Sequence, residues 1–162
     1  MPGFPVALLT LSDSRSSENG QDLSGDVLKQ MVESMGGMIL ETKIIPDDSE
    51  AISTQLRSWA DSGSVALILT TGGTGVGPRD NTPEATLKVV ERTVPGIVEH
   101  MRRETFGSTP NAVLSRQVAG IRGKCLIINL PGSPKGVKEC MESISYLIPH
   151  ALDMIYFEDT SH

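Results

Sequence analysis

The feature that most constrains the fold is an unbroken run of apolar residues, VALIL at positions 65–69. A strand that is apolar at every position buries both of its faces, which is typical of a central parallel strand covered by helices on two sides. Largely apolar segments at residues 6–11 and 124–130 repeat this pattern. The run at 65–69 therefore predicts an α/β protein with its sheet in the middle.

Segments with apolar side chains at helical spacing alternate with these strands. We expect strands at residues 6–11, 38–45, 65–69 and 124–130. The first expected helix spans residues 23–35, and the second begins at Asp48 or Ser49 and carries Ile52, Leu56 and Trp59 on one face. Three more are expected: one at 85–91 after an N-cap at Thr82, one that begins near Pro95, and one at 135–155 with a bend near Pro149. This alternation predicts a three-layer α/β/α fold with a mostly parallel central sheet. No repeat or linker is evident, so residues 1–162 are expected to form a single domain.

Composition narrows the choice of partners and compartment. The formal net charge of −6 is poorly suited to nonspecific nucleic-acid binding, which depends on neutralising phosphates. No apolar run approaches the roughly 18 residues that span a bilayer, and the first residues lack a basic signal-peptide region. We therefore expect a cytoplasmic protein without membrane or nucleic-acid partners. Cys125 and Cys140 have no CxxC neighbour and are expected to be reduced, buried thiols.

Four loops are expected to meet at one edge of the sheet. In α/β folds of this kind, ligands bind outside the carboxyl ends of the strands. The loops after Leu11, Ile45, Leu69 and Leu130 all follow predicted strands. Their convergence predicts a ligand site at this edge.

A glycine-rich turn, TTGGTG at residues 70–75, follows the central strand. Glycines let the backbone turn tightly and approach a ligand, so that exposed N–H groups can hold oxyanions. The turn is not a Walker A motif, because no GK[ST] follows, and residues 78–80 (PRD) separate it from the next helix. By itself, the turn is equally compatible with a tight connection that binds nothing.

Three aspartates follow strands or precede helices near that edge: Asp22, Asp47 and Asp80. Each has a purely structural explanation. Asp22 can cap a helix, as can Asp48, the neighbour of Asp47, and Asp80 can close a turn. Together, beside a phosphate-binding turn, they would repel an anionic ligand unless a hard cation such as Mg²⁺ lay between them. The set therefore predicts a metal-dependent phosphoryl or nucleotidyl transfer.

A second turn, NLPGSPK at residues 129–135, ends one predicted strand and opens a helix whose N-terminus can bind an anion. Side chains that can add hydrogen-bond donors are Ser133, Lys135, Arg79, Ser115 and Arg116, although each of these can simply be solvated. The three histidines show no metal-ligand spacing and receive no role.

The strings LTTGGTG (69–75), PRD (78–80) and TPEAT (82–86) are together far more specific than any one of them. They resemble the molybdenum-cofactor domain shared by MogA, MoaB and the G domain of gephyrin. The resemblance covers nearly the whole chain, and residues 120–133 are closest to gephyrin and its plant counterpart. The chain departs from the pattern at Asn81, where many relatives have valine, and in its first loop at 14–20.

The resemblance implies a trimeric molybdopterin adenylyltransferase of molybdenum cofactor biosynthesis. In such domains the terminal phosphate of molybdopterin attacks the α-phosphate of Mg-ATP, and pyrophosphate is released. A MoeA-like domain or protein then inserts molybdate. The alternative is a non-catalytic molybdopterin-binding or trimeric scaffold module, similar to MoaB or to the gephyrin G domain. The sequence leaves open whether the domain is fused to a longer chain and whether it forms trimers or hexamers.

The resemblance also assigns roles to residues at matching positions. It implies catalysis and Mg²⁺ binding by Asp47 and Asp80; nucleotide binding by Gly72, Gly73, Thr74, Gly75, Pro131, Gly132 and Ser133; and pterin binding by Asp22, Ser115, Arg116 and Asn129. It does not say which aspartate contacts the metal directly.

Overall fold

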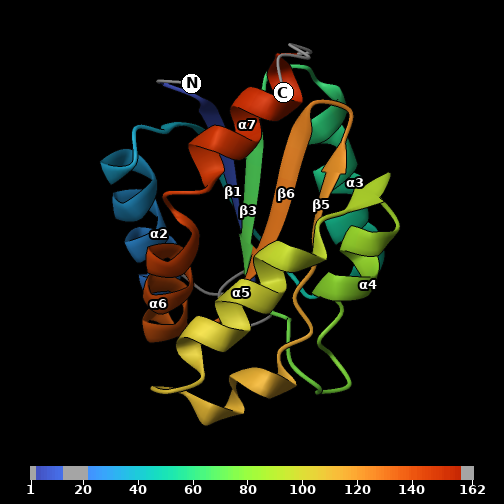
Figure 1. Ribbon diagram of the computed structural model, residues 1–162. Coiled ribbons are helices and arrows are strands. Elements are labelled where there is room, and N and C mark those ends of the chain that lie inside the picture. The colour runs from blue at the N-terminus through green and yellow to red at the C-terminus, as the bar shows by residue number, and fades with distance from the viewer. Residues whose placement is uncertain (1–2, 13–21, 158–162) are drawn as a thin grey trace.

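A six-stranded sheet runs through the centre of the computed structural model, which describes residues 3–12 and 22–157 (Figure 1). The strand order is β2-β1-β3-β6-β5-β4. The strands are β1 (Pro5–Leu11), β2 (Met38–Ile45), β3 (Leu67–Thr71), β4 (Arg92–Thr93), β5 (Ala119–Arg122) and β6 (Cys125–Leu130). Strands β2, β1, β3 and β6 are parallel, whereas β5 pairs antiparallel with both β6 and β4. The prediction of a mostly parallel sheet is confirmed.

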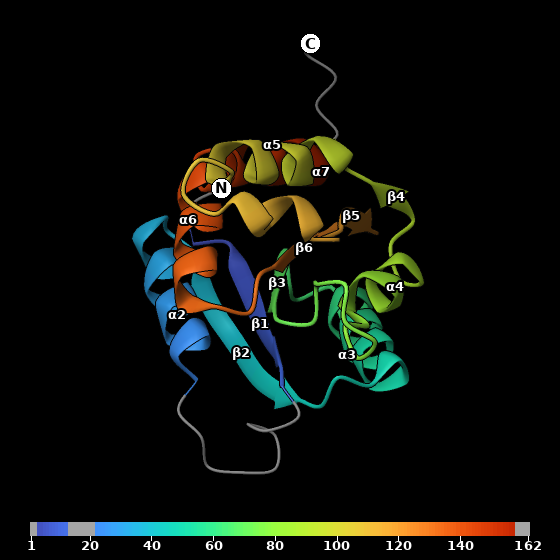
Figure 2. The same ribbon diagram turned by 90° about the horizontal axis from the view of Figure 1, so that it is seen from below.

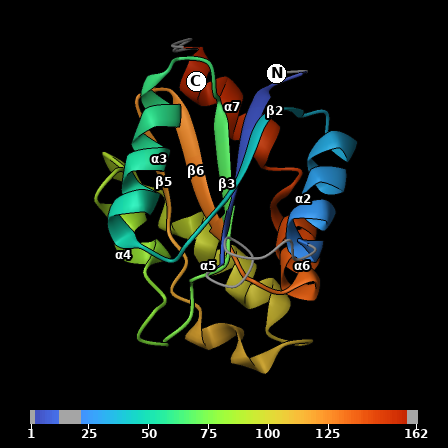
Figure 3. The ribbon, with the colours of Figure 1, turned by 180° about the vertical axis from the view of Figure 1, so that it is seen from behind.

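Helices cover both faces of the sheet, as the end-on view shows (Figure 2). One face carries α2 (Leu23–Ser34), α5 (Pro95–Thr105), α6 (Pro134–Ile144) and α7 (Ile148–Tyr156). The other carries α3 (Ser49–Asp61) and α4 (Thr82–Leu87), seen from behind in Figure 3. The three-layer α/β/α prediction is therefore confirmed.

Alternate residues of the central strands supply the two halves of the core. In β1, Val6 and Leu8 pack with the helices of one face, whereas Ala7 and Leu9 pack against α3 and α4. This follows from the period of two along a strand. It explains why the central strands are apolar at nearly every position.

The third strand begins later than the apolar run at 65–69 predicts. It spans Leu67–Thr71. It also ends later, because Thr70 and Thr71 pair in register with Asn129 and Leu130 of β6. The polar threonines are part of the sheet, and the glycine-rich turn starts only after Thr71.

The helix predictions need three corrections. Helix α4 ends at Leu87, not at residue 91, because Glu91 N–H donates to Ile121 O and its neighbour Arg92 belongs to β4. Thr82 is not the N-cap of α4. Asn81 occupies that position, and the Thr82 hydroxyl donates to Gly72 O instead.

The segment predicted as one bent helix at 135–155 is two helices. Helix α6 ends at Ile144 and α7 starts at Ile148, with Pro149 in its first turn. Proline has no N–H and clashes with the preceding turn, so it is accommodated at the start of a helix and not in its interior. Strands β4 and β5 and the 3-10 helix η1 (Pro110–Leu114) had no counterpart among the predicted elements.

The expected helix caps and buried cysteines are confirmed. Asp22 and Asp48 are the N-caps of α2 and α3 and accept hydrogen bonds from Gly25 N and Ala51 N. Both cysteines are free and buried, and burial raises the pKa of Cys125 to about 12 and that of Cys140 to about 11. Among the described residues no helix is long and apolar enough to cross a membrane. The first-loop segment at 14–20 lies outside the described residues.

Candidate functional site

The carboxyl ends of four parallel strands lie along one edge of the sheet, where the predicted loops meet. Ser12 N–H donates to Ile45 O at 3.0 Å, which joins the ends of β1 and β2. Gly72 N–H donates to Leu130 O at 3.2 Å, which joins the ends of β3 and β6. The loops that follow these strands are thereby held side by side.

The glycine-rich turn needs glycine at two positions for structural reasons. Gly72 and Gly73 have φ angles of 101° and 67°. Residues that carry a side chain rarely adopt positive φ angles of this size. A methyl group on Gly72 would lie 2.5 Å from Leu11 O, and one on Gly73 would lie 2.4 Å from Thr82 Oγ1. The turn is therefore packed tightly between the end of β1 and the start of α4.

Asp47 lies against this turn from the loop after β2. A methyl group on Gly73 would lie 2.9 Å from Asp47 Oδ1, an oxygen that is nearly inaccessible to solvent. The Asn81 side-chain amide donates to Asp47 O at 3.1 Å. The loop that carries Asp47 is thus fastened to the segment that follows the glycine-rich turn.

Asp80 lies against the far part of the same turn. Its Oδ2 accepts a hydrogen bond of 2.8 Å from Gly77 N–H and would lie 2.9 Å from a methyl group on Gly75. Its N–H donates to Gly77 O at 3.1 Å, so the structural role of closing a turn is also present. Asp47 and Asp80 therefore flank one turn, the first at Gly73 and the second at Gly75.

The second turn rests on the first. Thr71 Oγ1 donates to Pro131 O at 2.7 Å, and a methyl group on Gly132 would lie 3.4 Å from Gly72 Cα. Ser133 caps α6 by accepting from Gly136 N–H at 3.0 Å. The prediction that both turns share one edge of the sheet is borne out in their position.

A cavity of about 740 Å³ opens between the two turns, η1 and α6. This volume is within the roughly 300–1,000 Å³ that is usual for small-molecule sites. The residues of the predicted site that line it are Thr74, Gly75, Ser115, Pro131 and Ser133. Asp47 and Asp80 are not among the residues that line it.

Sequence reasoning missed the opposite wall of this cavity. Thr105, Ser108 and Thr109 line it from α5 and the turn that follows, and Glu139 lines it from α6. Ser108 Oγ donates to Glu139 Oε2 at 2.8 Å. No local pattern indicates these residues, because α5 and α6 come together only through packing.

Asp22 lies apart from the large cavity. It lines a smaller hollow of about 210 Å³ with Asp26, Lys29 and Lys43, and the two hollows share no lining residue. Its Oδ2 also accepts from Thr10 Oγ1 at 2.7 Å. The structure gives Asp22 a capping role and does not bring it beside Ser115.

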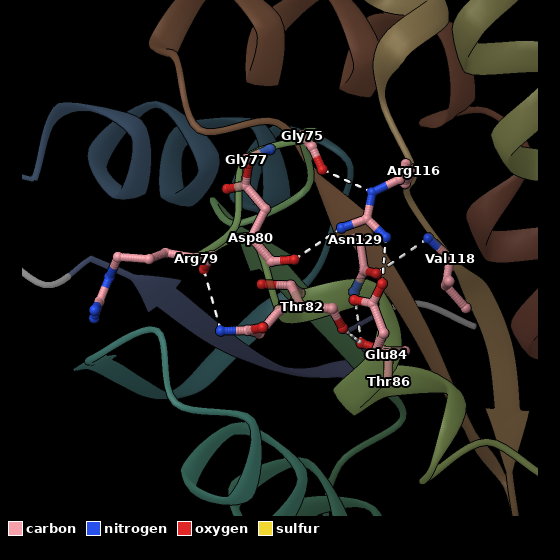
Figure 4. A network of polar contacts seen from close by, with 11 residues as sticks. Gly75, Gly77, Arg79, Asp80, Thr82, Glu84, Thr86, Arg116, Val118 and Asn129 are labelled. Carbon is pink, nitrogen blue, oxygen red and sulfur yellow. Dashed lines mark hydrogen bonds and ion pairs between the residues drawn. The ribbon is translucent and has the colours of Figure 1, made fainter.

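Asn129 is fully buried, and the protein itself binds its side chain. Its Nδ2 donates to Thr70 Oγ1 and Thr86 Oγ1, each at 3.0 Å, and its Oδ1 accepts from Val118 N–H at 3.0 Å. Figure 4 shows part of this network. The side chain joins β3, β6, α4 and the start of β5, and the described geometry leaves it no surface toward a ligand.

Arg116 is half-buried, and its guanidinium is directed at the loop that carries Asp80 (Figure 4). It donates to Gly75 O at 2.7 Å and to Asp80 O at 2.8 Å, and it also pairs with the Glu84 carboxylate. This hydrogen bond from Arg116 holds the pKa of Glu84 below its ordinary value. The neighbouring residues Ser115 and Gln117 line the cavity, whereas Arg116 does not.

The donor set beside the turn fits a magnesium ion that substrate phosphates help to bind. Within residues 3–12 and 22–157, no group of three or more His, Cys, Asp or Glu side chains is arranged to hold a metal alone. Mg²⁺ is usually bound by one or two carboxylates together with phosphates and water. Asp47 and Asp80, which lie against the glycine-rich turn at Gly73 and Gly75, would supply such carboxylates.

Comparison with known proteins gives consistent results. Residues 7–150 match the model of a family described as probable molybdopterin binding domain. A molybdopterin adenylyltransferase of Helicobacter pylori is 40% identical over 157 residues, which cover 96% of this chain and 89% of that protein. The molybdenum cofactor synthesis protein cinnamon of Drosophila melanogaster is 42% identical over 96% of this chain, which spans 26% of that longer protein. A crystal structure of the molybdopterin biosynthesis enzyme MoaB of Thermus thermophilus superimposes with a TM-score of 0.88, at 43% identity, covering 94% of this chain and 96% of that one.

Proposed function

Because this chain belongs to the family of probable molybdopterin binding domains, we propose that it transfers the adenylyl group of ATP to molybdopterin in molybdenum cofactor biosynthesis. The observation that carries the proposal is that Asp47 and Asp80 both lie against one glycine-rich turn, at Gly73 and Gly75, and that this turn also lines a cavity of about 740 Å³. Relatives that bear the name molybdopterin adenylyltransferase align over nearly the whole chain, which supports the same activity.

The reaction joins two anions. An oxygen of the molybdopterin phosphate attacks the α-phosphorus of ATP, the bond between that phosphorus and the bridging oxygen to the β-phosphorus breaks, and pyrophosphate leaves with the electron pair. The attacking phosphate is already ionised near neutral pH, so the protein needs no strong general base. Its task is to position both substrates and to stabilise charge.

The described residues suit these tasks. Asp47 and Asp80 would hold Mg²⁺, which offsets the charge of the phosphates when it is bound. Nucleotide binding is assigned to Gly72, Gly73, Thr74, Gly75, Pro131, Gly132 and Ser133. Backbone N–H groups of these two turns can donate to phosphate oxygens. Ser115, on the wall of the cavity, remains the proposed pterin contact, and a pterin role for Asp22 would require a ligand that also reaches the smaller hollow.

We further propose that the protein acts as a cytoplasmic homotrimer and passes its product to a molybdate-inserting, MoeA-like domain or protein. The first part rests on the family resemblance. The second is supported by the length of the Drosophila relative, in which the region matching this chain is only 26% of the protein. Mass measurement in solution distinguishes a trimer from other assemblies.

The direct test is to incubate the purified protein with molybdopterin, ATP and Mg²⁺ and to separate the products. Adenylyl-molybdopterin and pyrophosphate should form in equal amounts. If molybdopterin binds but no product forms, the chain is a binding or scaffold module and the proposed activity is wrong.

A further inference from the structure

Arg116 contacts two carbonyl groups of one loop and a carboxylate of the helix that follows it, all of them far from Arg116 in sequence. Its Nε donates to Gly75 O at 2.7 Å, its Nη2 donates to Asp80 O at 2.8 Å, and its Nη1 pairs with the Glu84 carboxylate. The Arg116 backbone N–H also donates to Thr74 O at 2.8 Å. The two carbonyl acceptors are 41 and 36 residues away along the chain, so the guanidinium links two distant segments.

These contacts fasten both ends of the segment that carries Asp80. Gly75 is its first residue, Asp80 is its last, and the carboxylate of Asp80 lies within it on Gly77 N–H at 2.8 Å. Glu84, the third partner, stands in the first turn of α4. A planar guanidinium presents its donors in a fixed fork, and so one side chain sets the spacing of all three acceptors.

We propose that Arg116 is a positioning residue: it holds the loop of Asp80 in the position relative to the substrates that adenylyl transfer requires. We also propose that Arg116 is not a ligand of the pterin. The proposal rests on the function proposed above, since it presupposes that Asp80 acts in the transfer. Misplacing a reacting group by about 1 Å can lower a rate by about 10²-fold, so the anchoring of this loop affects turnover directly.

Two further observations argue against a ligand role. The positive charge is already paired with Glu84, whose pKa this hydrogen bond lowers. Ser115 and Gln117, on either side of Arg116, line the large cavity, whereas Arg116 does not, and its guanidinium points at the loop (Figure 4).

Stability alone is a weak explanation for this arrangement. The side chains of Arg116 and Glu84 are 38% and 53% exposed, and ion pairs that are this exposed contribute little to the free energy of unfolding. The effect of the contacts is therefore expected in the placement of the loop more than in the stability of the domain.

The discriminating variant is Arg116→Lys, which keeps the charge but loses the fork. We expect kcat to fall by about 10-fold to 10²-fold, with the KM for molybdopterin unchanged. A pterin ligand would behave differently: KM would rise in Arg116→Ala and lysine would largely restore it. An unchanged kcat in Arg116→Lys, or a rise in KM that lysine restores, overturns the proposal.

The matched control is Arg103→Lys. Arg103 lies on α5 with its side chain 72% exposed, and its side-chain polar contacts recorded among the described residues are with Glu104 and His100. This variant should keep the wild-type kcat and KM. A loss in Arg103→Lys equal to that in Arg116→Lys would mean that any arginine replacement slows the enzyme, and this would also contradict the proposal.

Hydrogen–deuterium exchange supplies a measurement that does not depend on activity. Amides at residues 75–80 should exchange faster in Arg116→Lys than in the wild type, while those of β1 and β3 stay protected. If Arg116→Lys does not fold, Glu84→Gln is measured instead and should accelerate the exchange of the same amides, by less.

A wild-type protein without transferase activity refutes the proposed function. An active wild type with unchanged exchange and kcat in both variants refutes only the role of Arg116.

Discussion

The side-chain amide of Asn81 donates a hydrogen bond of 3.1 Å to the backbone carbonyl of Asp47. It joins the loop after β2 to the segment after the glycine-rich turn, and so it connects the neighbourhoods of both proposed metal-binding aspartates. The same amide reaches Arg79 O at 3.3 Å.

Replacing Asn81 by alanine should remove this link. We expect the free energy of unfolding to fall by about 1 kcal/mol, the usual contribution of a partly buried hydrogen bond. The rate of adenylyl transfer should fall as well, because the Asp47 loop is less firmly held. Urea denaturation and a steady-state assay measure the two effects. Gln30→Ala, at an exposed position on α2, should change neither.

Replacing Asp47 or Asp80 by asparagine should remove a metal-binding charge while keeping the side-chain shape. We expect kcat to fall by at least about 10²-fold for each, as for loss of one group that stabilises transition-state charge. Molybdopterin binding, followed by fluorescence without ATP, should change much less.

The matched control for this pair is Asp48→Asn. Asp48 adjoins Asp47 in sequence but caps α3, and asparagine caps helices about as well as aspartate does. Full activity in Asp48→Asn with loss in Asp47→Asn would locate the effect at Asp47. Wild-type rates in Asp80→Asn would remove its proposed role.

Replacing Asn129 by alanine should destabilise the domain and not only weaken pterin binding. The change leaves the part-buried Val118 N–H without its acceptor and takes a buried hydrogen bond from each of Thr70 and Thr86. We expect a loss of about 3 kcal/mol in the free energy of unfolding, since unsatisfied buried groups cost about 1–3 kcal/mol each. Thr70→Val, which removes a single acceptor, should cost about 1 kcal/mol. A stable Asn129→Ala protein with a raised KM for molybdopterin would support the ligand role and contradict this prediction.

The pair of Arg116 and Glu84 should leave a signature in the pH dependence of stability. The hydrogen bond from Arg116 lowers the pKa of Glu84 in the folded protein below its ordinary value of 4.5. A carboxyl group whose pKa is lower when folded stabilises the protein above its unfolded pKa and loses that contribution as pH falls through the folded pKa. The difference in unfolding free energy between wild type and Glu84→Gln should therefore be constant near neutrality and shrink below pH 4.5. A difference that grows on acidification would show that the sign is wrong.

Much of the fold follows from short segments of the chain. The apolar runs at 6–11, 65–69 and 124–130 predict strands buried on both faces, because a side chain alternates between the faces regardless of what lies beyond. The turn glycines and the caps at Asp22 and Asp48 are equally local, since they depend on the backbone angles of a few neighbouring residues. The order of strands and helices placed both turns and both aspartates at one edge of the sheet.

Only the tertiary structure decided which polar side chains remain available there. The resemblance assigns both Asn129 and Arg116 to pterin binding, yet one is buried in a network with Thr70 and Thr86, and the other anchors the loop of Asp80. The wall formed by α5, η1 and α6 and the antiparallel β5 were likewise invisible. These features depend on contacts between segments tens of residues apart. Packing determines where such segments meet, and no local periodicity encodes it.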